Sequence, residues 1–157
     1  MADQFVPHVV VTDGAAAVKF YREVFGGTEG EIMMDRDGKR LLHGEVVLDG
    51  HKVFVSDEFA DEEGGSLRVP QKLGGTCVRI TVMVNDADEI MRRAVSRGAV
   101  VKMAVQDMFW GGRYGKFVDP FGHEWGIDQE IGQPTDDEQR AAAEEFFRRQ
   151  NAVKHDD

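Results

Sequence analysis

The sequence predicts an α+β fold of two tandem βαβββ modules, which form curled mixed sheets around a cavity, plus a C-terminal helix. A shift of 72 residues superposes four pairs of landmarks without a gap: Gly26 on Gly98, Gly50 on Gly122, Asp13 on Asn85 and Val6 on Val78. The order of predicted strands and helices repeats at the same shift. A chain of 157 residues, of which 41% are hydrophobic, is long enough for one domain with a sizeable core.

The first module spans residues 4–57 and begins with a strand over residues 5–12, which are rich in valine. Asp13 is the predicted N-cap of a helix whose apolar residues recur at helical spacing until Gly26 ends it. Three strands follow, and the Asp-Gly pairs between them are typical of hairpin turns. These strands are predicted at residues 30–34, 41–48 and 52–56.

The second module spans residues 76–130 and repeats this order. A strand over residues 78–84 precedes a helix that is capped by Asp86 or Asp88 and ends at Gly98. The remaining three strands are predicted at residues 99–103, 115–119 and 123–127. Both modules are therefore predicted to run strand, helix, strand, strand, strand.

A glycine-rich linker over residues 58–75 joins the modules and reads as a surface loop, which either covers a pocket or is simply solvated. The tail over residues 134–153 begins with a capping-box pattern at Thr135–Glu138. Phe146 and Phe147 belong to an apolar stripe on the helix that follows. We expect this helix to dock on the domain or on a partner subunit.

Charge and composition exclude several classes of partner. The 19 basic and 29 acidic residues give a net charge of −10, which disfavours nucleic acid and anionic membranes. The single cysteine, Cys77, excludes an intrachain disulfide and is expected in the core, because it lies in an apolar run. The first residues do not have the pattern of a signal peptide, and no apolar run reaches the length of a membrane span, so a cytoplasmic protein is expected.

Several motifs resemble one superfamily. They are the helix segment Asp13–Tyr21 with Gly26 and Gly27, the hairpin Asp119–Trp125, and the segments 73–76 and 106–115. Together, over residues 5–130, they resemble the vicinal oxygen chelate superfamily of glyoxalases, bleomycin-resistance proteins and extradiol dioxygenases. The last two segments resemble its PhnB-like branch.

The resemblance implies a divalent metal held by His and Glu at positions on the first and last strand of each module. In this chain those positions carry Val6, Phe54, Val78 or Arg79, and Gly126, which are not metal ligands of the usual kind. The resemblance therefore implies a glyoxalase/bleomycin-resistance-type protein that binds a small molecule, with no cofactor expected. One alternative is a metal-dependent lyase, isomerase or transferase with displaced ligands His8, Glu45 and Glu124. Another is a non-catalytic regulatory or structural dimer.

Strand alternation adds candidates for the ligand site. His8 shares a strand face with Val6, and Glu124 shares one with Gly126, so we expect both to face one cavity with Phe54. Paired there, Glu124 is the candidate general base and His8 tunes it. The loop aromatics and a nearby arginine are further ligand candidates, namely Phe109, Trp110, Arg113 and Tyr114.

Core packing is the expected role of Phe117 and Trp125, whereas Trp110 is open between packing and the edge of the pocket. A homodimer is expected because one four-stranded sheet per module leaves edges and apolar faces that a single chain covers poorly.

Overall fold

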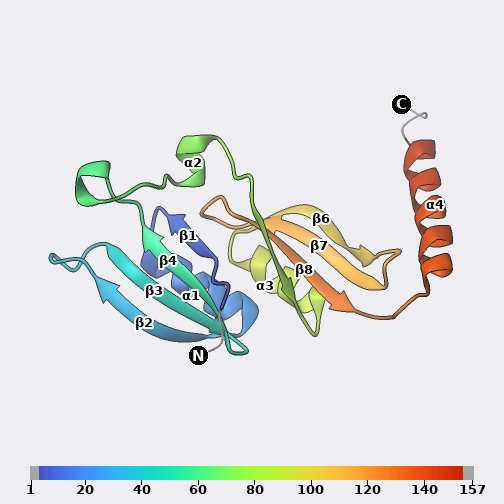
Figure 1. Ribbon diagram of the computed structural model, residues 1–157, viewed down its shortest axis with the longest axis horizontal. Coiled ribbons are helices and arrows are strands. Elements are labelled where there is room, and N and C mark those ends of the chain that lie inside the picture. The colour runs from blue at the N-terminus through green and yellow to red at the C-terminus, as the bar shows by residue number, and fades with distance from the viewer. Residues whose placement is uncertain (1–3, 154–157) are drawn as a thin grey trace.

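The structure is a computed structural model that describes residues 4–153, and it confirms the α+β fold with one four-stranded mixed sheet per module (Figure 1). Residues 1–3, which belong to the N-terminal segment assessed above for a signal peptide, lie outside the described part. The strand orders are β1-β4-β3-β2 and β5-β8-β7-β6, so the second sheet repeats the first. Neither sheet closes on itself, so each sheet presents an open face.

The first module runs through five elements in the predicted order. They are β1 (His8–Val11), α1 (Gly14–Phe25), β2 (Thr28–Met34), β3 (Leu41–Leu48) and β4 (His51–Asp57). Strand β1 pairs in parallel with β4, while β3 pairs antiparallel with both β2 and β4. The Asp49-Gly50 turn has positive φ angles of 47° and 82°, as the two-residue hairpin signal requires.

The second module has the same pairing. Its elements are β5 (Arg79–Met83), α3 (Ala87–Ser96), β6 (Val100–Asp107), β7 (Gly112–Val118) and β8 (Glu124–Glu130). Strand β5 pairs in parallel with β8, and β7 pairs antiparallel with both β6 and β8. The sixth strand is longer than predicted, because its outer residues keep pairing with β7 past two register shifts.

Equivalent side chains begin both helices. Asp13 accepts a hydrogen bond from the Ala16 backbone N at 2.9 Å, and Asp86 accepts one from the Glu89 backbone N at 2.9 Å. These two N-caps satisfy amide groups that a helix start leaves free. The predicted caps are therefore confirmed, with Asp86 rather than Asp88 in the second module.

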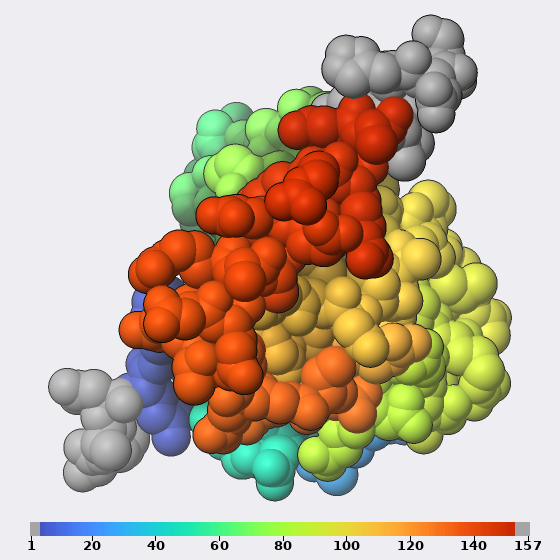
Figure 2. Space-filling model, turned by 90° about the vertical axis from the view of Figure 1, so that its right-hand side faces the viewer, coloured from blue at the N-terminus to red at the C-terminus, as the bar shows by residue number. Residues whose placement is uncertain are grey.

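Two short helices lie in the linker, η1 (Asp61–Glu63) and α2 (Pro70–Leu73), and the tail forms α4 (Asp136–Val153). Thr135 and Glu138 form the predicted capping box, since the Thr135 backbone N donates to Glu138 at 2.8 Å and the Glu138 backbone N donates to Thr135 Oγ1 at 3.4 Å. Figure 2 shows α4, in red, lying across the end of the second module, where Phe146 and Phe147 pack on Phe109.

The two modules meet through their helices, α1 and α3 (Figure 1), and aromatic side chains pack at the same place. The cluster is formed by Phe20, Tyr21, Phe25, Phe117, Phe121 and Trp125. Phe117 and Trp125 are fully buried, which confirms their predicted role in the core. Because the helices face inward, the opposite face of each sheet points away from the core.

A single carboxylate lies in the middle of this cluster. Asp119 is 4% exposed and accepts hydrogen bonds from the Tyr21 hydroxyl at 2.7 Å and from Trp125 Nε1 at 2.8 Å. It also accepts from the backbone N of Phe121 and of His123, each at 2.9 Å. Burial, and then the neighbouring Asp119 carboxylate, raise the pKa of Tyr21 well above its ordinary value. Tyr21 therefore remains a hydrogen-bond donor at neutral pH.

Cys77 is exposed, so the expectation of a core cysteine is wrong. Strand β5 begins only at Arg79, and Cys77 lies before it in the end of the linker. The apolar run that suggested burial continues into a strand whose face away from α3 is exposed.

Within residues 4–153, no helix combines the length and the apolar character that crossing a membrane requires.

Replacing Asp119 with Ala is expected to lower the free energy of unfolding by about 3 kcal/mol or more, because three buried donors and one partly buried donor lose their acceptor. Urea denaturation followed by circular dichroism measures this. Tyr21→Phe is the matched control, since it removes one donor and leaves the other three bonds, at a cost of about 1 kcal/mol. An Asp119→Ala variant no less stable than Tyr21→Phe would contradict this role.

Candidate functional site

The open face of the first module carries His8, His43, Glu45, Lys52, Phe54 and Ser56, and we call this set the module-one face. Three of the candidate ligand residues, His8, Glu45 and Phe54, are thus brought to one surface. The strand register explains this, because both His8 and Glu45 pair with Phe54 across neighbouring strands.

Aromatic contacts and hydrogen bonds hold the module-one face in place. His8 Nε2 forms a hydrogen bond with Ser56 Oγ at 3.0 Å. The Phe54 ring contacts the His8 ring and the His43 ring edge to face, with centroids 6.1 Å and 4.7 Å apart. Partial burial, and then the nearby His43, lower the pKa of His8, so its ring is neutral at neutral pH.

A buried carboxylate lies on the same face. Glu45 is 8% exposed, and its carboxylate accepts a hydrogen bond from Lys52 Nζ at 3.0 Å and lies 3.6 Å from His43 Nε2. The hydrogen bond from Lys52 is the main reason why the pKa of Glu45 lies below its ordinary value. Glu45 is therefore an anion under neutral conditions.

The open face of the second module carries Arg79, Tyr114, Lys116, Glu124, Gly126 and Asp128, and we call this set the module-two face. The Glu124 carboxylate accepts a hydrogen bond from Arg79 Nε at 2.5 Å. This ion pair satisfies Glu124 and keeps its carboxylate at the level of the sheet. The pair also holds the pKa of Arg79 above its ordinary value.

Trp110 and Phe109 lie on the loop between β6 and β7, at the far end of the module-two face. The ring of Trp110 contacts the rings of Phe109 and Tyr114, at centroid distances of 5.0 and 5.6 Å. Trp110 Nε1 donates to Asp128 Oδ2 at 3.2 Å, while Asp128 Oδ1 is buried without a hydrogen-bond partner among the described residues.

Arg113 does not lie on this face, and its expected role with an anionic ligand is not supported. Its guanidinium donates to Asp88 at 2.6 and 3.0 Å and to Asp107 at 2.7 Å. The reason is strand alternation: residue 113 belongs to β7, so it points to the α3 side while Tyr114 points to the open side. The pKa of Arg113 lies above its ordinary value because of these acids.

The structure does not bring His8 and Glu124 together within one chain. His8 pairs with Ser56 on the first sheet, and Glu124 pairs with Arg79 on the second. The expectation that both face one cavity assumed that the two open faces meet. They point outward instead, because the helix sides of the two sheets pack against each other. For the same reason, His8, Glu45 and Glu124 form no metal site in a single chain.

The linker partly covers both faces. A hollow of about 260 Å³ lies between His8, Ser56 and the linker residues 59 and 63–67. A second hollow of about 480 Å³ lies between Glu124, Lys102, Val100, Val118 and the linker residues 70, 71 and 74–76. The second has the size and the mostly apolar walls of a small-molecule pocket. Ion pairs of Lys72 with Glu58 and of Arg68 with Asp61 join parts of the linker to each other, and the ion pair of Arg40 with Glu63 ties the linker to the first module.

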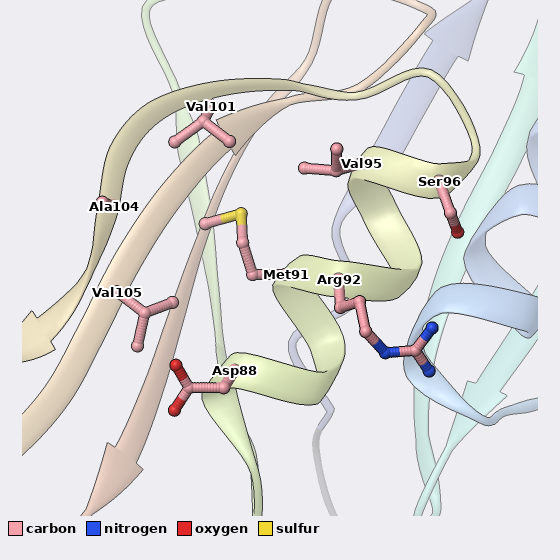
Figure 3. A pocket seen from close by; sticks show the side chains of 8 residues that line it. All are labelled: Asp88, Met91, Arg92, Val95, Ser96, Val101, Ala104 and Val105. Atoms are coloured by element: carbon pink, nitrogen blue, oxygen red, sulfur yellow. The ribbon is translucent and has the colours of Figure 1, made fainter.

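A third hollow of about 580 Å³ lies on the other side of the second sheet, between α3 and β6 (Figure 3). Its floor is apolar, with Met91, Val95, Val101 and Val105, while Asp88 and Arg92 lie at its edge. None of the ligand residues that the sequence singled out lines this hollow.

At the positions where the resemblance implies metal ligands, Phe54 and Gly126 carry no metal-binding side-chain atom. Phe54 packs between two histidine rings, as described above. At Gly126, a Cβ atom would lie 2.8 Å from the Tyr114 hydroxyl and 2.8 Å from Thr81 Oγ1, so a ligating side chain does not fit without rearrangement. The residues present at these positions therefore do not fit a metal.

Sequence reasoning missed His43, Ser56, Lys52 and Asp128. Strand alternation predicts two of them, because residues two apart on a strand lie on the same face. His43 is two residues from Glu45, and Asp128 is two residues from Gly126. Ser56 and Lys52 follow from the same rule applied to Phe54. Their partners depend on strand register, which the sequence does not supply.

The chain is thus built from two βαβββ modules that dock through their helices and leave polar and aromatic open faces. Residues 3–127 match the model of the Glyoxalase/Bleomycin resistance protein/Dioxygenase superfamily, and the chain belongs to this superfamily. The resemblance found in the motifs is thereby confirmed.

Three similar proteins illustrate the relationship. Mb0911c, an uncharacterised protein of Mycobacterium bovis, is 40% identical over 136 residues, which cover 87% of this chain and 89% of the relative. The structure of TioX from Micromonospora sp. ML1 is 26% identical, with a TM-score of 0.63, and the match covers 83% of this chain and 100% of TioX. The PhnB protein of Bacillus cereus shares the fold at 14% identity and a TM-score of 0.60, over 81% of this chain and 99% of PhnB.

The pKa of His8 provides a test of the module-one face. NMR titration is expected to place it below the ordinary value of about 6.5. His43→Ala is expected to raise it, since the charge of His43 is one of the two causes of the shift. Folding lowers the pKa of His8, so the neutral ring contributes to the stability of the protein above about pH 6.5. This contribution is lost as the pH falls through the folded-state pKa. A His8 pKa at or above the ordinary value would show that the ring is not held as described.

Proposed function

We propose that this protein is a glyoxalase/bleomycin-resistance-type small-molecule-binding protein that works without a metal at the superfamily's usual positions. The observation that carries the proposal is the filling of those positions by Phe54 and by Gly126 with the overlying Tyr114. The open faces retain what a binding site needs, namely aromatic surface and a few fixed polar groups. We also propose that the protein is cytoplasmic.

The second hollow and the adjoining module-two face form the proposed binding surface. Val100 and Val118 supply apolar walls, while Lys102 and Glu124 supply charges of opposite sign. Further along the sheet, the Trp110 ring contacts Tyr114 and adds aromatic surface. This combination suits a ligand with a flat apolar body and hydrogen-bond donors at its edge.

We further propose that the protein is a homodimer in which the module-one face of one copy covers the module-two face of the other. Exposed apolar side chains lie on both faces, including Met33 at 49%, Met83 at 65% and Val100 at 60% exposure. Charges outside the ion pairs described above are complementary, since Glu31 lies on one face and Lys102 and Lys116 lie on or beside the other. In such a dimer, His8 and Glu124 of different copies line one site.

The first test measures binding. A panel of antibiotics and aromatic natural products, with bleomycin among them, is screened by thermal shift and confirmed by calorimetry. We expect a binder whose affinity falls about tenfold in His8→Ala and in Glu124→Gln, with folding unchanged. Arg113→Gln is the matched control, because Arg113 lies on the other side of the sheet, and it is expected to bind normally.

Elemental analysis of the same preparations distinguishes the alternatives. The proposal expects no stoichiometric, tightly held metal in the purified protein. A stoichiometric metal that disappears in His8→Ala would overturn it in favour of a metal-dependent enzyme with displaced ligands. A stable dimer that binds nothing in the panel would favour the regulatory or structural role.

The second test measures the assembly by analytical ultracentrifugation. We expect a dimer, and we expect Val100→Asp to shift it toward the monomer, because the substitution places a charge on the module-two face. Val95→Asp is the control, since Val95 is also exposed but lines the hollow beside α3. A monomer at micromolar concentration, or equal effects of the two substitutions, would argue against this dimer.

A further inference from the structure

Strand β2 contains a bulge opposite Glu45. The register passes from Glu29 paired with Val46 to Ile32 paired with Gly44, so Gly30 and Glu31 together oppose Glu45. A bulge of this kind re-aims the side chains at its position. Here it brings the Glu31 carboxylate to the side of the sheet on which Glu45 and His43 lie.

Three metal-ligating groups are gathered by this bulge. One ligand atom from each of Glu31, His43 and Glu45 lies within 4.8 Å of the others. His43 Nε2 and Glu45 Oε1 are 3.6 Å apart. For a metal bonded at about 2.1 Å to each donor, tetrahedral geometry places donors about 3.4 Å apart. The His43–Glu45 distance is already close to this value, and the exposed Glu31 closes the remainder by changing its rotamer.

The surroundings hold two of the three groups in position. A Cβ atom at residue 30 would lie 2.7 Å from Glu45 Oε2, so glycine at this position leaves the space that the carboxylate occupies. The Glu31 backbone N donates to the same oxygen at 3.4 Å. Phe54 packs edge to face on the His43 ring. Preorganisation of this kind reduces the cost of assembling a ligand set.

Lys52 occupies the place of a cation in the structure. Its ammonium lies 2.9 Å from Glu45 Oε2, and its side chain is 38% exposed. An exposed lysine moves into water at low cost, and a divalent ion competes with it for the same carboxylate. The site is therefore expected to exchange its cation rather than to hold it tightly.

We propose that Glu31, His43 and Glu45 bind one exchangeable first-row divalent transition ion, which displaces Lys52 from Glu45. One imidazole and two carboxylates are the donor set that zinc, cobalt, nickel and manganese share in proteins. With three protein ligands, the ion keeps positions for water on the open side of the sheet. This site lies on β2 and β3, apart from the superfamily's usual positions, and its test does not require a small-molecule ligand to be found.

The test titrates chelator-treated protein with cobalt(II), followed by its visible absorption, and with zinc(II), followed by calorimetry. We expect one ion per chain. His43→Ala and Glu31→Gln are expected to weaken binding roughly tenfold or more, because loss of even an indirect partner of a metal costs about that much. Glu31 is exposed, so its variant tests the site without disturbing the fold.

Lys52→Gln is the decisive variant, because it removes the competitor while all three ligands remain. It is expected to tighten binding several-fold. The controls are His51→Ala, which alters an exposed histidine outside the cluster, and His8→Ala, and neither is expected to change the affinity. Absence of binding, binding that survives His43→Ala, loss in either control, or no tightening in Lys52→Gln would each overturn the proposal.

Discussion

The carboxylate of Asp119 accepts four hydrogen bonds in a part of the core from which water is excluded. Two of the donors, Tyr21 and Trp125, belong to different modules, so the geometry of this one group fixes how the modules dock. Docking through α1 and α3 turns the helix sides of both sheets inward. The orientation of the open faces, and with it the location of every candidate site, follows from this arrangement.

The same fold supports different chemistry on its two open faces. The first combines histidines, a buried carboxylate and a lysine, which is a set suited to cations and proton transfer. The second combines aromatic rings with a paired Arg79 and Glu124, which is a set suited to an organic ligand. The two modules therefore share the order of their strands, while the side chains at equivalent strand positions differ.

Elements that depend on local signals were predictable from the sequence. The hairpin turn at Asp49-Gly50, the N-caps and the core positions of Phe117 and Trp125 agree with the structure, because turn chemistry and periodicity act over a few residues. Alternation also grouped His8 with Phe54 correctly. The predictions that were wrong depend on how distant parts of the chain meet. Cys77 lies outside its expected strand, and Arg113 belongs to a strand rather than to a loop. The separation of His8 from Glu124 depends on which sides of the sheets pack together.

The contact between Tyr21 and Asp119 joins residues 98 positions apart, whereas each sheet is built from one contiguous stretch of chain. Closing a longer loop costs more entropy, and chains fold from the N-terminus as they are synthesised. The first module is thus synthesised before Asp119, and the aromatic side chains around Tyr21 are solvent-exposed until the second module docks. The hydrogen bond between Tyr21 and Asp119 therefore forms only after both modules have been synthesised.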